Sequence, residues 1–121
     1  MSFLTDDALN ALLDVIGQNA DRLLVHETEP TTYAEATSGV IGEINVDSAD
    51  YTKSDTAGGR ETAVQEKGVV ADASGTDAYV AQVDDDNDRL LAVHPVDASA
   101  GFTEGLAYNV SGVTIEAQDP A

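Results

Sequence analysis

Two apolar runs on either side of an acidic break constrain the fold of this chain more than any other stretch. Side chains in residues 78–83 alternate in direction, so one set can face a core while the other faces outward. Five polar residues, Asp84–Asp88, interrupt the run before Leu90, Leu91 and Val93 resume it. Two strands joined by a polar loop are typical of a β-hairpin. We therefore expect an antiparallel hairpin here, with the rest of the molecule stacked on it.

Other segments also have the pattern of strands. Leu23, Leu24 and Val25 lie in a row within residues 22–26, which predicts a strand covered on both faces, and Pro30 ends that segment. Residues 33–39 fit either a short helical turn or an irregular loop. From Val40 onward, short strands are expected about every ten residues, as in all-β sandwiches and barrels. The expected breaks between them are Ala57–Gly59, Lys67–Gly68, the loop Asp97–Gly101 and a bulge or bend at Ser111–Gly112.

One amphipathic helix is expected near the N-terminal end, from about residue 6 to residue 16. Thr5 is its expected N-cap, Leu4 would pack on Leu9 across that cap, and Gly17 offers a stop. The apolar face of this helix can pack on the chain's own sheet, or it can be offered to a partner subunit. In the second case the candidate interface residues are Leu9, Leu12, Leu13 and Ile16.

These patterns together predict a mainly β fold, an antiparallel β-sandwich or barrel-like domain with one N-terminal amphipathic helix. We expect a single domain over residues 1–121, with the helix at about 6–16 and the β-domain at about 22–118, because 121 residues can bury a core without covalent staples. The chain has no cysteine, so disulfides are excluded. It has no apolar run of membrane length and no secretory leader pattern, so a soluble protein with no membrane partner is expected.

Charge narrows the range of functions. The chain has 23 Asp and Glu residues against five Lys and Arg residues, a formal net charge of -18. Small domains usually have a net charge of about 2 to 8 in magnitude, and a larger surplus destabilises a compact state unless salt screens it. Such a composition resembles that of proteins from salt-accumulating archaea. Mimicry of nucleic acid by carboxylates is an alternative explanation, whereas binding of nucleic acid is not expected without a basic patch.

The candidate chemistry is sparse. The acidic run Asp84–Asp88 suggests calcium, but Arg89 and Pro95 occupy positions where an EF-hand loop requires glycine and glutamate, so a solvent-exposed hairpin tip is the simpler interpretation. His26 and His94 follow apolar strand residues, and either strand packing or a metal pair fits them. No phosphate-binding loop or activated nucleophile is present in the sequence pattern. We therefore predict no catalytic residues, no metal and no cofactor, and a protein that is not an enzyme.

Several stretches in order resemble a family of small structural proteins of tailed viruses. They are the opening helix, Leu23–Val25 leading into Glu29–Ala36, Gly59–Arg60 before a strand, Gly75–Ala78 before another, Asn87–Leu91, and the closing Val113–Pro120. The resemblance covers nearly the whole chain, although each stretch is short and this sequence contains far more acid than its look-alikes.

This resemblance implies a virion structural protein, a capsid decoration or vertex (turret) protein of a haloarchaeal tailed virus. It would lie on the capsid surface, bind the major capsid protein, and form a homo-oligomer, a trimer or a pentamer, as lattice symmetry suggests. A protein of the tail or fibre is the first alternative. An acidic DNA mimic and a halophile surface-adhesion β-domain are the others.

Overall fold

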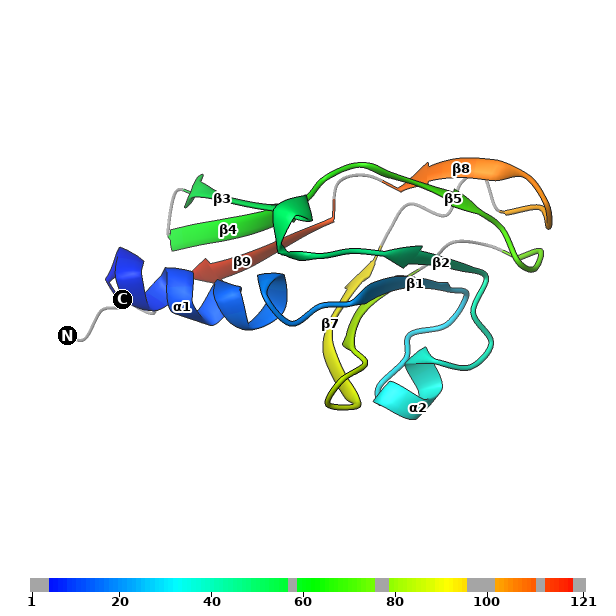
Figure 1. The fold of residues 1–121 in the computed structure, drawn as a ribbon, viewed down its shortest axis with the longest axis horizontal. Coiled ribbons are helices and arrows are strands. Elements are labelled where there is room, and N and C mark those ends of the chain that lie inside the picture. Colours follow the sequence, from blue (N-terminus) through cyan, green and yellow to red (C-terminus); the bar gives the residue numbers. More distant parts are fainter. Residues whose placement is uncertain (1–4, 57–58, 76–78, 96–101, 111–112, 119–121) are drawn as a thin grey trace.

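The computed structural model describes residues 5–56, 59–75, 79–95, 102–110 and 113–118 (Figure 1). Its elements in order are α1 (Asp6–Gly17), β1 (Arg22–His26), α2 (Tyr33–Ala36), β2 (Gly42–Asn45), the 3-10 turn η1 (Ser48–Asp50), β3 (Tyr51–Thr56), β4 (Gly59–Val64), β5 (Lys67–Val70), β6 (Tyr79–Asp84), β7 (Arg89–Pro95), β8 (Ala107–Val110) and β9 (Thr114–Gln118). The predicted mainly β fold with antiparallel sheets and an N-terminal helix is confirmed. The sheets do not close into a barrel.

A four-stranded antiparallel sheet in the order β2-β1-β6-β7 contains the predicted hairpin. β6 pairs with β7 from Tyr79 opposite Pro95 to Asp84 opposite Arg89, and the register shifts between Gln82 and Val83. β1 lies between β2 and β6. Because β1 is central and the sheet is covered on both faces, all residues of β1 after Arg22 are buried, which confirms the prediction from its apolar run.

Two hydrophobic clusters lie on opposite faces of this sheet. The larger contains Leu23, Val25 and Val80, together with Val64, Val69, Val110 and Val113 from or beside the other two sheets. The smaller contains Leu24, Ala81 and Val83, with Ala36 of α2 packed on them. Side chains of successive strand residues point to opposite faces, which is why Leu24 belongs to one cluster and its two neighbours to the other. The larger cluster joins all three sheets.

The helix α1 packs on the three-stranded sheet β3-β4-β9 (Figure 1). Thr5 is its N-cap, as predicted, and the Thr5 hydroxyl accepts a hydrogen bond from the Ala8 backbone N–H at 3.2 Å. Leu9 and Leu13 are 1% and 2% exposed because they face the chain's own β-strands. This sheet is connected to the hairpin where the Tyr51 hydroxyl of β3 bonds to Gln82 of β6 and where Val64 and Val80 share the larger cluster, whereas α1 packs on the three-stranded sheet itself.

A two-stranded ribbon, β5 with β8, lies at the end of the molecule away from α1 (Figure 1). The expected turn at Lys67–Gly68 is wrong, because these residues pair with Val110 and Asn109 and belong to β5. Gly42 permits β2 to run close against this ribbon: a methyl group on Gly42 would lie 2.8 Å from Val69 Cγ2.

The open alternatives for residues 33–39 are resolved by α2, whose N-cap Thr32 accepts a hydrogen bond from the Glu35 backbone N–H at 3.1 Å. Several expectations lie outside the described residues: the Leu4 contact, the break at Ala57–Gly58, the loop Asp97–Gly101, and the bend at Ser111–Gly112. Neither α1 nor α2 is long and apolar enough to cross a bilayer.

Candidate functional site

The polar contacts of the fold concentrate at the tip of the β6–β7 hairpin. Asp84 is 1% exposed, so the expected solvent-exposed tip is wrong for this residue. Its Oδ2 atom accepts hydrogen bonds from Arg89 Nη2 at 2.7 Å and Asn87 Nδ2 at 2.8 Å. The hydrogen bond from Asn87, and next in size the one from Arg89, hold the pKa of the Asp84 carboxyl below its usual range. The ionised carboxylate therefore closes the turn between the two strands.

Asp85 ties the tip to the start of β1. Arg22 donates from Nε to Asp85 Oδ2 at 2.7 Å and from Nη2 to Oδ1 at 2.8 Å, a bidentate pair. The Tyr33 hydroxyl donates to the same Oδ1 at 2.8 Å, and Arg22 Nη1 reaches Glu43 of β2 at 3.0 Å. The Arg22 hydrogen bond lowers the pKa of Asp85, and the Asp85 carboxylate raises that of Tyr33. One carboxylate in the turn after β6 thus joins β1 and α2.

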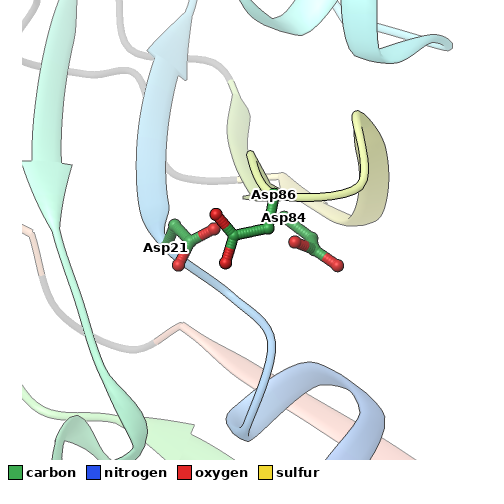
Figure 2. A group of neighbouring side chains, drawn as sticks. All are labelled: Asp21, Asp84 and Asp86. Carbon is green, nitrogen blue, oxygen red and sulfur yellow. The ribbon is translucent and has the colours of Figure 1, made fainter.

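Three carboxylates converge beside this clamp. Ligand atoms of Asp21, Asp84 and Asp86 lie within 4.8 Å of one another, and we call these residues the three-aspartate cluster. Figure 2 shows Asp21, just before β1, next to the two tip residues. Antiparallel pairing of Arg22 with Val83 brings Asp21 to the tip. Sequence patterns could not indicate this cluster, because Asp21 lies 63 residues before Asp84 and outside the acidic run.

The three-aspartate cluster has the donor atoms that hard cations prefer, but much of its hydrogen-bonding capacity is already used. Asp21 Oδ2 accepts from the Asp85 backbone N–H at 2.8 Å, and Asp84 is bound by Asn87 and Arg89. Calcium takes six to eight oxygen ligands, more than three carboxylates with occupied oxygens offer. The Arg89 guanidinium also forms an ion pair with Asp84, and its positive charge disfavours a cation there. The geometry therefore fits a clamp that fixes the hairpin tip. The prediction of no metal stays a prediction.

The two histidines are not brought together. His26 of β1 is buried, and its Nε2 lies 2.7 Å from the Ala36 carbonyl oxygen. β6 separates β1 from β7, and His94 pairs with Val80, which in turn pairs with Val25. Since Val25 and His26 are consecutive strand residues, His94 and His26 point to opposite faces of the sheet. The metal-pair alternative is therefore wrong, and His26 instead joins β1 to α2.

A buried amide lies on the face of the four-stranded sheet that bears the larger core cluster, because Gln82 pairs with Leu23. Gln82 is fully buried, and its Oε1 accepts a hydrogen bond from the Tyr51 hydroxyl at 2.5 Å. Its Nε2 has no hydrogen-bond partner among the residues that the structure describes. Burial raises the pKa of Tyr51 above its usual range, with a further contribution from Asp50. This pair joins the three-stranded sheet to the four-stranded sheet. The alternation of residues in the sequence could not indicate it, because Gln82 there is only one residue of a predicted strand.

All five cationic side chains of the chain form ion pairs with its own carboxylates, a use that the sequence analysis did not anticipate. Besides Arg22 and Arg89, the pairs are Lys53 with Asp14, Arg60 with Asp55, and Lys67 with Asp50. Each joins two different elements, for example β3 to α1. The few positive charges therefore act as cross-links within the fold.

The predicted interface residues separate into two groups. Leu9 and Leu13 are buried against the chain's own strands, which removes them from any surface offered to a partner. Leu12 is 54% exposed and Ile16 is partly exposed. Val15, absent from the predicted set, is 45% exposed beside Leu12. Whether α1 binds a partner stays a prediction, which now concerns its outer side.

No family model, curated protein or solved structure significantly matches this chain. Its function is therefore inferred from its residues and their geometry.

Proposed function

We propose that this protein is a non-enzymatic structural component of a virion, a decoration or vertex protein on the outside of the capsid of a haloarchaeal tailed virus. The observation that carries the proposal is that the buried and half-buried polar side chains bond to one another or to the backbone within the fold. Asp84, Asp85 and Arg22 fix a hairpin tip, His26 holds α2, and Tyr51 with Gln82 joins two sheets. Groups that a catalytic site would expose to substrate hold the fold together instead.

The charge distribution supports the halophilic part of the proposal. Because all five cations are engaged in ion pairs within the chain, none is left to neutralise the surplus of carboxylates. A surface with a net charge of -18 is tolerable where concentrated salt shortens the Debye length to about 3 Å at 1 M. The resemblance of ordered sequence stretches to small proteins of tailed viruses supports the viral part.

The proposed partners are the major capsid protein and further copies of this chain, in a trimer or a pentamer. Docking on a symmetric shell repeats each contact many times, so weak individual contacts suffice. Contacts made in brine must rely on apolar groups and hydrogen bonds, because salt screens attraction between charges. The exposed apolar side chains Leu12, Val15, Val70 and Leu106 are the groups suited to this role.

Mass spectrometry of purified particles, from a virus whose genome encodes this chain, tests the proposal. We expect the chain in stoichiometric amounts in the head fraction after heads and tails are separated in concentrated KCl. Immunogold labelling of intact particles should place it on the outside of the shell. Its absence from particles refutes the virion proposal, and recovery only with tails shows that the tail alternative is the right one.

A further inference from the structure

The outer side of α1 is a second apolar stripe on a helix whose inner side is already buried. Ala8, Ala11, Leu12 and Val15 follow the spacing i, i+3, i+4, i+7, which places them on one face. Leu12 and Val15 are 54% and 45% exposed, while Leu9 and Leu13 on the inner side are buried. A helix with apolar residues on both sides is typical of one covered on both sides. In the described chain, only the inner side is covered.

The β5–β8 ribbon presents the complementary shape. An open hollow of about 470 Å³ lies along it, lined by Gly68, Val69, Val70, Ala107 and Tyr108. Val70 is 57% exposed and Leu106, adjacent to Ala107, is 55% exposed. The alternation explains the exposure of Val70: Val69 points into the core, so Val70 points away from it. The ribbon thus offers a concave apolar surface.

These four residues are the large apolar side chains that stand exposed in the described part of the chain. They form two pairs, and Figure 1 shows α1 and the β5–β8 ribbon at opposite ends of the long axis. A ridge at one end and a hollow at the other allow successive copies to contact head to tail. Such heterologous contacts close into a ring when the rotation between copies permits it.

Charge favours this pairing over the symmetric ones. Residues 105–115 form an uncharged stretch between Glu104 and Glu116, and Gly68–Ala71 also has no charged residue. The α1 stripe, in contrast, has Asp7 and Asp14 along one edge, because residues 7, 11 and 14 follow helical spacing. Two α1 helices in contact would bring the Asp7 carboxylates of both copies together, whereas the residues that line the hollow are all uncharged. Asp14 is already paired with Lys53 of its own chain. Contact between two ribbons avoids the charges but leaves both α1 stripes uncovered.

We propose that the outer stripe of α1 in one copy binds in the β5–β8 hollow of the next copy, so that the chain associates with itself head to tail. This is a helix-in-groove contact in which Leu12 and Val15 are the anchors. It deepens the self-association within the proposed function, but it needs no capsid. Loss of the virion proposal therefore leaves it standing.

Sedimentation velocity of the purified protein in 2 M KCl, over a range of protein concentrations, tests the proposal with two variants, Leu12→Glu and Val70→Glu. Both sites are more than half exposed, so both variants should fold, and circular dichroism checks this. Each variant should weaken self-association more than about tenfold, since a charge replaces an anchor. Thr52→Glu, at an exposed position on β3, is the matched control and should associate like the wild type.

Mixing the variants identifies the type of contact. The Leu12→Glu copy keeps an intact ribbon and the Val70→Glu copy keeps an intact helix, so an equimolar mixture should form a dimer and nothing larger. Wild-type protein should associate more strongly as KCl rises, because screening weakens the repulsion between acidic copies. A monomeric wild type in 2 M KCl overturns the proposal. So does a variant that associates like the wild type, because the contact would then be symmetric and use only one surface.

Discussion

Replacing Asp85 by asparagine tests whether the hairpin tip is held by its ion pair. The substitution puts an amide N–H donor where one Asp85 oxygen accepts from Arg22, so one of the two hydrogen bonds of the bidentate pair becomes a donor facing a donor. Hydrogen bonds to charged groups contribute about 1.5 to 3 kcal/mol each. Partial exposure of both side chains, 23% for Arg22 and 30% for Asp85, favours the lower part of that range. We expect a loss of about 1.5 to 2 kcal/mol in the free energy of unfolding.

Asp86→Asn is the matched control, because it removes the same charge from the same turn. Asp86 is exposed and lies beside two other carboxylates, so its neutralisation should leave stability unchanged or raise it slightly. Urea unfolding in 2 M KCl, followed by circular dichroism, measures both variants at constant ionic strength. The difference between them should correspond to about 5 to 10 °C in melting temperature for a chain of this size. A difference below about 0.5 kcal/mol would show that the pair contributes no more than an ordinary surface contact.

Three further predictions concern the same contacts. Tyr51→Phe should cost about 1 to 3 kcal/mol because Gln82 Oε1 loses its donor, and adding Gln82→Met should recover part of that loss in urea unfolding. The stability that Asp85 gains from its lowered pKa is present above about pH 4, so the gap between wild type and Asp85→Asn should close as the pH falls further. Calcium at 5 mM in 2 M KCl should not raise the melting temperature, whereas a clear rise would make the three-aspartate cluster a cation site.

Local sequence patterns correctly predicted those helices and strands whose conformation does not depend on pairing with distant segments. The apolar run of Leu23, Leu24 and Val25 identified the central strand, and Thr5 identified the start of α1. Lys67–Gly68 misled because two residues common in turns were placed in a strand by pairing with β8, about forty residues further along the chain. Tertiary pairing overrides local preference in such cases.

The candidate site was less predictable, because strand register determines which residues meet. Arg22 and Asp85 are 63 residues apart in the chain, and nothing in either segment indicates the other. The helix shows a different limit: its spacing revealed the apolar residues, but the predicted interface combined Leu9 and Leu13 with Leu12 from the other side. Separating the sides required the position of the sheet on which α1 packs.

Salt acts on this chain in two opposed ways, and their magnitudes decide which prevails. Screening weakens the ion pairs of the five cations, which are worth about 0 to 1 kcal/mol each where exposed. It also weakens repulsion between surplus carboxylates, about 0.4 kcal/mol for two charges 10 Å apart in water, and a net charge of -18 sums many such terms.

The free energy of unfolding should therefore rise between 0.1 and 1 M KCl and then level off, because the Debye length has fallen from about 10 to about 3 Å. Urea unfolding at a series of KCl concentrations measures this curve. A flat or falling curve would show that the ion pairs dominate, and a steady linear rise would indicate exclusion of salt from the surface rather than screening.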